Sequence, residues 1–190
     1  MTALLGGSFN PIHNGHIGLA RWIVANGYAE SVWLMVSPQN PLKTSPELAD
    51  EYLRLRWASI ACRDIEGITA SDFEYHLPRP SFTWQTLMAL RETFPEEQFA
   101  LTIGADNWLL FHRWARHEWI LQHTQLLVYP RQGYEINTNE LPQNVTLMPA
   151  PLFPYSSTAI REGLRAGTDI SSYLPKDVLT DIIRHKAYLQ

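Results

Sequence analysis

The sequence contains a single cysteine, Cys62, among its 190 residues. One cysteine cannot form a disulfide within the chain, which fits a reducing compartment. The sequence also lacks any uninterrupted run of about 18 apolar residues, the length that a membrane-spanning helix needs. Its amino terminus has neither a basic region nor a long apolar stretch, so it does not resemble a signal peptide. We therefore expect a cytoplasmic protein with no membrane partner.

An excess of basic residues is missing as well. The chain has 15 Lys and Arg against 19 Asp and Glu, a net charge of −4 with histidine neutral. Proteins that coat nucleic acid normally carry a basic stripe, so we expect no nucleic-acid partner, and any phosphate must bind at a local site. The histidines follow no zinc-ligand pattern, and no cage of carboxylates is evident, so we expect no metal site built by the chain itself. The sequence leaves the oligomeric state open.

Hydrophobic residues make up 45% of the chain, enough for a sizeable core. Short apolar runs rich in β-forming residues predict buried strands at Ala3–Leu5, Val32–Val36, Phe99–Ile103 and Leu126–Tyr129, and weaker strands at Ile68–Phe73 and Val145–Met148. Helical spacing appears between them at Gly15–Asn26, Leu48–Cys62 and Trp84–Thr93. This alternation predicts an α/β fold with a parallel sheet.

The chain shows no internal repeat and no low-complexity tract. The polar stretch Arg131–Asn144 is too short for a domain linker and is typical of a surface loop. Two further helices are expected within residues 156–190, the second with Pro175 in its first turn. We therefore expect one domain over residues 1–190, with 156–190 as a carboxy-terminal helical part.

The first predicted strand runs directly into Gly6-Gly7, and a helix is expected from about Asn14. Ligands of open α/β sheets bind at the carboxyl ends of strands, and a helix that starts there offers free N–H groups to an anion. His13 and His16 are three residues apart and share one helix face, where both could donate to phosphate oxygens. Gly15 between them leaves room for a flat group, such as a purine, to lie against the backbone. The alternative is a simple glycine turn with histidines that cap the helix.

The segment Gly7-Ser8-Phe9-Asn10-Pro11-Ile12-His13-Asn14-Gly15-His16 resembles the first signature of the nucleotidyltransferase superfamily, in its His-x-Gly-His form. In that family the two histidines contact the phosphates of ATP during adenylyl or cytidylyl transfer. The resemblance implies catalytic roles for His13 and His16, and ATP contacts for the residues Gly7, Ser8, Phe9 and Gly15. Asn10 stands where relatives often have an acidic residue, and we expect it to contact substrate.

A second anion site is predicted at Ser156-Ser157-Thr158-Ala159-Ile160-Arg161. A serine cap leaves neighbouring N–H groups free, and Arg161 lies one turn beyond Ser157 on the same face. An ordinary capped helix with a solvated arginine is the alternative. The segment is similar to the second signature of the same superfamily, Ser-Ser-Thr-x-Ile-Arg. That resemblance implies that Ser156, Ser157 and Arg161 hold the phosphates that leave as pyrophosphate, with Arg161 counted among the catalytic groups.

Smaller segments concern the second substrate. Lys43 offers a point charge to an acceptor phosphate, and the helix start near Thr83 offers backbone N–H groups to a carboxylate, with Ser81 or Thr83 as its cap. Asp106 could accept a bond from a ribose hydroxyl, and Trp114 could stack on an aromatic ring. A solvated lysine, a capping aspartate and a core tryptophan are the respective alternatives.

Taken together, these segments resemble the family of bacterial nicotinate-nucleotide adenylyltransferases over nearly the whole chain. The resemblance implies a Rossmann-like parallel sheet with flanking helices, and a reaction of ATP with nicotinate mononucleotide that yields nicotinate adenine dinucleotide and pyrophosphate, with Mg²⁺ arriving alongside ATP. It implies that Trp114 stacks on the pyridine ring and that backbone amides of Thr83 and Ala115 hold the nicotinate carboxylate. The remaining implied contacts are Lys43 with the acceptor phosphate, Gly104 and Asp106 with adenosine, and Arg131 at the nucleotide site.

Leu42 departs from that family, because many relatives carry histidine before the lysine. Three alternatives stay open at this point. In the first, the acceptor is nicotinamide mononucleotide, which differs from the nicotinate form by one charge. In the second, the acceptor is phosphopantetheine, whose adenylyltransferases share the first loop. In the third, the chain is a nucleotide-sensing module without catalysis.

Overall fold

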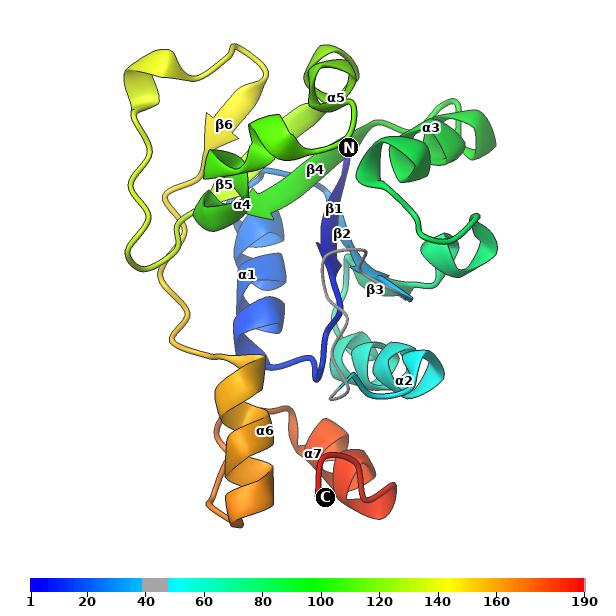
Figure 1. Ribbon diagram of the computed structural model, residues 1–190, viewed down its shortest axis with the longest axis vertical. Coiled ribbons are helices and arrows are strands. Elements are labelled where there is room, and N and C mark those ends of the chain that lie inside the picture. The colour runs from blue at the N-terminus through cyan, green and yellow to red at the C-terminus, as the bar shows by residue number, and fades with distance from the viewer. Residues whose placement is uncertain (39–47, 190) are drawn as a thin grey trace.

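Six parallel strands form one sheet in the computed structural model, which describes residues 1–38 and 48–189 (Figure 1). The strands are β1 (Thr2–Gly7), β2 (Ser31–Val36), β3 (Ile68–Ser71), β4 (Phe99–Gly104), β5 (Gln125–Tyr129) and β6 (Val145–Leu147), in the order β3-β2-β1-β4-β5-β6. The predicted parallel sheet is confirmed. Two strands are shorter than expected. β6 ends at Leu147 rather than Met148, and β3 ends at Ser71, after which Phe73–His76 forms a 3₁₀ helix, η1.

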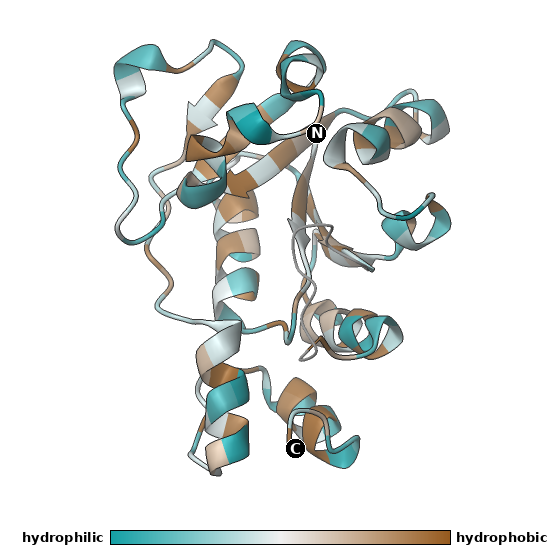
Figure 2. Ribbon diagram, viewed as in Figure 1, coloured by the Kyte–Doolittle hydropathy of each residue, from teal (hydrophilic) through white to brown (hydrophobic). Residues whose placement is uncertain are grey.

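Helices cover both faces of the sheet because its strands are apolar on both sides. In β1, Ala3 and Leu5 belong to one core cluster and Leu4 to the other, as the two-residue period of a strand requires. The first cluster packs under α1 (Asn14–Ala25) and α2 (Glu51–Cys62), and the second under α3 (Thr83–Thr93) and α5 (His117–His123). Figure 2 shows the hydrophobic residues concentrated along the strands, with hydrophilic residues along the outer sides of the helices.

Three short elements complete the sheet region: α4 (Ala105–Leu109), η2 (Phe111–Arg113) and η3 (Thr138–Glu140). The strand order places β1 next to β4, so the chain crosses to opposite sides of the sheet after these two neighbours. Their carboxyl ends, Gly7 and Gly104, are the point at which doubly wound sheets bind ligands. The loops after β1 and β4 are therefore the place to look for a site.

The last two helices, α6 (Ser157–Ala166) and α7 (Lys176–Arg184), lie beyond the carboxyl end of β1 (Figure 1). The predicted cap of α6 is confirmed, because Ser156 Oγ accepts a bond from the Ala159 N–H. Pro175 lies one position earlier than expected, at the N-cap of α7 rather than in its first turn.

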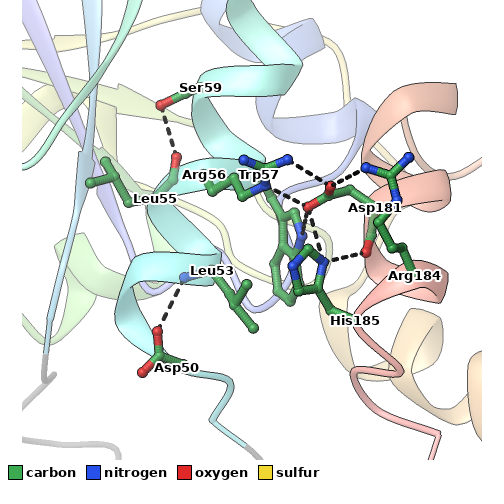
Figure 3. Close-up of polar contacts among 9 residues, drawn as sticks. All are labelled: Asp50, Leu53, Leu55, Arg56, Trp57, Ser59, Asp181, Arg184 and His185. Atoms are coloured by element: carbon green, nitrogen blue, oxygen red, sulfur yellow. Dashed lines mark hydrogen bonds and ion pairs between the residues drawn. The ribbon is translucent and has the colours of Figure 1, made fainter.

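Asp181 fastens α7 to α2. Its buried carboxylate accepts two bonds from Arg56, at 2.9 and 3.0 Å, and one from the Trp57 indole at 3.2 Å (Figure 3). The bonds from Arg56 hold the pKa of Asp181 below its usual range, against the effect of burial.

Throughout the described ranges, no helix combines the length and apolarity that a membrane crossing requires.

Candidate active site

The loop between β1 and α1 stacks the two predicted catalytic histidines on each other. The ring centroids of His13 and His16 lie 3.7 Å apart at 18°. His16 Nδ1 accepts the His13 backbone N–H at 3.3 Å, and the buried ring of Phe9 meets His16 edge-on at 4.9 Å. Phe9 has a backbone φ of 45°, a left-handed conformation that is uncommon outside glycine. The loop thus fixes the direction of both imidazoles before any ligand binds.

His13 is buried and neutral at neutral pH. Its side chain is 6% exposed, and burial together with the nearby charge of Arg131 lowers its pKa to about 4. Its buried Nδ1 has no hydrogen-bond partner in the described part of the chain. A buried polar nitrogen without a partner is costly, and a phosphate oxygen would supply an acceptor in the tautomer that protonates Nδ1.

Helix α1 directs one free N–H into this loop. The N–H groups of Asn14, His16 and Ile17 have backbone acceptors, whereas that of Gly15 has none among the residues described. We expected Gly15 to leave room for a purine against the backbone. The structure fills this space with His13 and Tyr155, whose atoms would lie 3.0–3.1 Å from a Cβ at position 15. A contact between Gly15 and ATP therefore stays a prediction, now through its N–H.

The two predicted anion sites are joined by direct hydrogen bonds. Ser157 Oγ donates to the Pro11 carbonyl at 3.0 Å, and Arg161 Nη1 donates to the Asn10 carbonyl at 2.9 Å. Because Ser156 caps the N–H of Ala159, the first N–H groups of α6 without an acceptor in the described residues are those of Ser157 and Thr158. The structure thus brings two helix N-termini, two imidazoles and one guanidinium to the carboxyl end of β1.

A third group lies at the end of β4. A Cβ at Gly104 would collide with the Asp106 carboxylate and lie 3.0 Å from Arg131 Nε, so any other residue would have to displace these side chains. Arg131 Nε pairs with Asp106 Oδ1 at 3.7 Å and Nη2 donates to the Tyr129 hydroxyl at 3.0 Å. The predicted residues Gly104, Asp106 and Arg131 are therefore neighbours, and the pairing of β4 with β1 brings their strand end next to the loop after β1.

The residues predicted to hold the nicotinate ring lie on two adjacent turns. Trp114, half-buried, follows η2 and packs against Phe111 with ring centroids 5.4 Å apart. The Arg116 guanidinium lies 4.2 Å from the ring centroid of Trp84 at the start of α3, so the turn that carries Ala115 faces the turn that carries Thr83. In the described residues, neither Thr83 N–H nor Ala115 N–H has a hydrogen-bond partner.

The expected cap of α3 was wrong. Neither Ser81 nor Thr83 caps the helix: Phe82 is the N-cap residue, and the Gln85 side chain accepts its N–H at 3.1 Å, while Thr83 is the first helical residue. Ser81 Oγ donates to Glu74 instead, at 3.4 Å, because the half-buried carboxylate needs donors. Burial raises the pKa of Glu74, and hydrogen bonds from Thr86, Ser37 and Ser81 oppose the rise.

Several sequence-based expectations lie beyond what the structure describes. Lys43 and Leu42 fall outside residues 1–38 and 48–189.

Asn10 is 8% exposed, and its Oδ1 accepts bonds from the Ala49 N–H at 3.0 Å and from the Tyr188 hydroxyl. This carboxamide oxygen therefore has a structural use, and a contact of Asn10 with substrate stays a prediction, as do the ligand contacts of Gly7, Ser8 and Phe9.

The sequence reasoning missed three residues that build the site. Arg54 of α2 donates to the Ser8 carbonyl at 2.7 Å, Tyr155 packs on Gly15, and Tyr188 bonds Asn10. Only Arg54 left a sequence signal, because it shares a helix face with Trp57, Ala58 and Ala61. An arginine in an apolar stripe indicates a buried charge with a specific polar task.

The described residues contain no group of three or more His, Cys, Asp and Glu side chains that could hold a metal ion. The Asp106 carboxylate, which follows the end of β4, is paired with Arg131.

Comparisons with known proteins agree with this geometry. Residues 4–163 match the family model described as cytidylyltransferase-like. A protein of Bacteroides thetaiotaomicron named probable nicotinate-nucleotide adenylyltransferase is 46% identical over 173 residues, covering 91% of this chain and 86% of its own length. A protein of Bacteroides fragilis with the same name is 43% identical over 183 residues, covering 96% of this chain and 91% of its own.

A solved structure shares the fold. Plasmodium falciparum nicotinic acid mononucleotide adenylyltransferase, complexed with NaAD, superposes with a TM-score of 0.82 at 20% identity and covers 98% of this chain and 96% of that one. At that identity the likeness supports the fold alone, and the relatives of higher identity carry the assignment. The chain therefore belongs to the cytidylyltransferase-like family and, within it, to the nicotinate-nucleotide adenylyltransferases.

Proposed function

We propose that the protein transfers the adenylyl group of ATP to the phosphate of nicotinate mononucleotide, releasing nicotinate adenine dinucleotide and pyrophosphate in NAD biosynthesis. The observation that carries this proposal is the direct bonding of α6 to the β1 loop, through Ser157 to Pro11 and Arg161 to Asn10. It gives one triphosphate two sets of donors at the same strand end. The names of the relatives support nicotinate mononucleotide as the acceptor.

The reaction needs no covalent intermediate with the protein. An oxygen of the acceptor phosphate forms a bond to the α-phosphorus of ATP. The bond from that phosphorus to the bridging oxygen breaks, and its electron pair leaves with pyrophosphate. The acceptor phosphate is largely ionised at pH 7, so no strong base is required. Holding the two substrates in line can lower the barrier by about 7–11 kcal/mol, which makes positioning the main task of the protein.

The histidines and Arg161 are proposed to stabilise the charge that develops on the phosphates. His16 and Arg161 donate to phosphate oxygens around the α–β bridge, where fixed donors are worth most. His13 binds as a neutral imidazole, since its pKa is about 4, and donates from the buried Nδ1 that has no partner in the described chain. The N–H groups of Gly15, Ser157 and Thr158, which have no acceptor among residues 1–38 and 48–189, add donors that do not titrate.

The acceptor side is proposed to use backbone rather than side-chain charge. The N–H groups of Thr83 and Ala115 hold the nicotinate carboxylate, and Trp114 stacks on the pyridine ring. Support comes from the cation–π contact of Arg116 with Trp84, which brings the two turns together. N–H donors favour a carboxylate over an amide, whose NH₂ group would face them. Lys43 is proposed to bind the acceptor phosphate.

Mg²⁺ is proposed to arrive with ATP and to be held by the phosphates. When bound, it neutralises part of the triphosphate charge and so assists the departure of pyrophosphate. The buried, unpaired Cys62 is compatible with the reducing cytoplasm, where we propose that the enzyme acts.

The test follows the fate of two phosphates of ATP, each labelled in a separate reaction. Purified protein is incubated with Mg²⁺, nicotinate mononucleotide and ATP labelled at either the α- or the γ-phosphate. We expect the α label in the dinucleotide and the γ label in pyrophosphate, with slower turnover when nicotinamide mononucleotide replaces the nicotinate form. Equal or faster turnover of the nicotinamide form, or turnover of phosphopantetheine alone, would show that nicotinate mononucleotide is not the preferred acceptor. Absence of turnover with all three acceptors would contradict the proposal.

A further inference from the structure

Arg54 is the largest charged side chain in the protein core. It is 0% exposed and lies in the buried face of α2 beside Trp57 and Ala58. A buried charge normally has a charged partner, yet Arg54 forms no ion pair within residues 1–38 and 48–189. Its burial lowers its pKa, and nearby acidic groups only partly oppose that effect. The energetic cost of such a group suggests a task that a neutral side chain cannot perform.

The Arg54 guanidinium donates hydrogen bonds to backbone carbonyl oxygens. Nη1 donates to the carbonyls of Ser8 and Ser37, both at 2.7 Å, and Nη2 donates to that of Pro38 at 2.8 Å. Nε donates to the Ala49 carbonyl at 2.9 Å. Because the guanidinium is planar and rigid, these bonds fix the relative positions of the segments that accept them. Those segments are the loop after β1, the end of β2 and the approach to α2.

A second connection runs beside the first. Ala49, whose carbonyl accepts from Arg54, donates its own N–H to Asn10 Oδ1 at 3.0 Å. Tyr188 reaches the same oxygen from the carboxy-terminal segment. Ser8 and Asn10 flank Phe9, the residue with the left-handed backbone whose ring packs against His16. The hydrogen bonds of Arg54 therefore converge on the loop residues that orient the histidines.

The connection continues toward the acceptor side. Ser37 donates its N–H to the Gly7 carbonyl at 3.0 Å, and its side chain lies close enough to Glu74 to lower the pKa of that carboxyl. Glu74 accepts from Ser81 and Thr86, which lie just before and within the first turns of α3. A chain of polar contacts thus links Arg54 to both halves of the proposed site.

We propose that Arg54 is a positioning residue for adenylyl transfer, which holds the β1 loop against the end of β2 so that His13 and His16 face the triphosphate. The role rests on the proposed function, because it concerns the same reaction. Arg54 acts through the loop and not by contact with the reacting atoms, since it is fully buried. Its loss should lower kcat while the protein stays folded.

The chain offers a matched control two residues away. Arg56 lies on the same helix and also donates several bonds, but to Asp181 of α7 (Figure 3). Arg54→Met and Arg56→Met remove the same charge and length from α2. Both should lower the melting temperature. At a temperature well below both melting points, we expect kcat per folded molecule to fall about 100-fold in Arg54→Met, the loss expected from misplacement by about 1 Å, and no more than about 3-fold in Arg56→Met.

Arg54→Lys keeps the charge but replaces the planar donor set by one nitrogen, which cannot reach carbonyls on several sides. We expect an intermediate kcat, about 10-fold below wild type by the same reasoning. This variant decides the question if Arg54→Met does not fold. A kcat equal to that of wild type in Arg54→Lys would contradict the proposal in that case.

A double-mutant cycle separates positioning from general stability. If Arg54 acts through the histidines, Arg54→Met should lower kcat by less than about 5-fold when His16 is already replaced by alanine. The effects of groups that act as a unit are not additive. In a Trp114→Ala background its full effect should remain. A full effect in the His16→Ala background, or a kcat of Arg54→Met within 3-fold of Arg56→Met, would overturn the role of Arg54. Absence of turnover by the wild type in the same assay would instead overturn the proposed function.

Discussion

The two halves of the candidate site are built differently. On the ATP side, hydrogen bonds join segments that lie far apart in the chain, such as Arg161 and Asn10, separated by 151 positions. On the acceptor side, Trp114 packs on Phe111 three residues away, and the predicted ligands of the carboxylate are backbone N–H groups at the ends of short elements. The first half is fixed by hydrogen bonds between distant segments, and the second by local turns that the contact of Arg116 with Trp84 brings together.

This difference assigns different tasks to side chains. Where donors are held before the substrate binds, they need no reorganisation as charge develops, so their removal lowers kcat. Where backbone groups bind a remote part of the substrate equally in the ground and transition states, changes raise KM. The comparison therefore predicts a separation of kinetic effects between the two halves, which the following substitutions examine.

The largest effect is expected from His16→Ala on the ATP side. His16 stacks on His13 and accepts its N–H, so the substitution removes one donor and loosens the other. We expect kcat to fall by about 10²–10³-fold, the range for a fixed donor to developing charge, with a small change in the KM for the mononucleotide. Steady-state kinetics with each substrate varied in turn measures both. A near-normal kcat would show that His16 takes no part in the mechanism. It would also contradict the expected separation of kinetic effects between the two halves of the site.

The next effect concerns the acid stability of the same loop. His13 has a folded-state pKa of about 4, below its ordinary value of 6.5, so its neutral form contributes stability above pH 6.5. That contribution is lost as the pH falls from 6.5 through 4, because the unfolded chain binds the proton first. The loss amounts to about 3 kcal/mol between pH 7 and pH 4.

Urea unfolding at pH 7 and pH 4 tests this value, with His13→Gln as the variant that cannot titrate. The difference in unfolding free energy between the two pH values should be smaller in the variant by about 3 kcal/mol. NMR titration of the His13 ring checks the cause directly. A ring that titrates near 6.5 in the free protein would show that the ATP side is less preorganised than we infer.

The fold was predictable because its signals are local. Four of the six strands are short apolar runs that end at or just before Gly, Ser or Pro, and all six are found within a few residues of their predicted places. The two anion sites could be proposed for a similar reason, since each is contiguous in sequence. Their direct contact was not, because the pairing of Ser157 with Pro11 depends on the path of the whole chain.

The parts that sequence reasoning missed are contacts between distant segments. The space beside Gly15 was expected to be open, but Tyr155, which lies 140 positions further along the chain, occupies it. Ser81 or Thr83 was expected to cap α3, yet the helix begins at Thr83, so Phe82 holds the cap position and the Ser81 hydroxyl donates to Glu74. Neither outcome leaves a trace within a short window of sequence.

A smaller effect is expected on the acceptor side from Trp114→Ala. The substitution removes the ring proposed to stack on pyridine, an interaction worth about 1–3 kcal/mol for comparable bases, so the KM for nicotinate mononucleotide should rise about 20-fold. The kcat should stay within about 3-fold, because stacking is made equally before and during the reaction. An unchanged KM would favour a core role for Trp114 beside Phe111. A large loss of kcat would show that the two halves are not separate.

The smallest effect is expected from Thr83→Pro, which removes a single backbone N–H. Thr83 is the first residue of α3, a position where proline is favoured, and Phe82 before it is already extended, with φ −102° and ψ 146°. Thr83→Ala is the matched control, because it removes the side chain and keeps the N–H. If that N–H holds the nicotinate carboxylate, the proline variant alone should raise the KM for nicotinate mononucleotide, by about 10-fold for one bond to a charged group.

Competition between the two mononucleotides sharpens this last test. Nicotinamide mononucleotide offers no carboxylate to the N–H, so its KM should change less, and the preference for the nicotinate form should narrow in Thr83→Pro but not in Thr83→Ala. A parallel rise in both KM values would mean that the proline disturbs the start of α3 as a whole. The carboxylate would then depend on other groups, and the acceptor side would owe its selectivity to side chains, as the ATP side does.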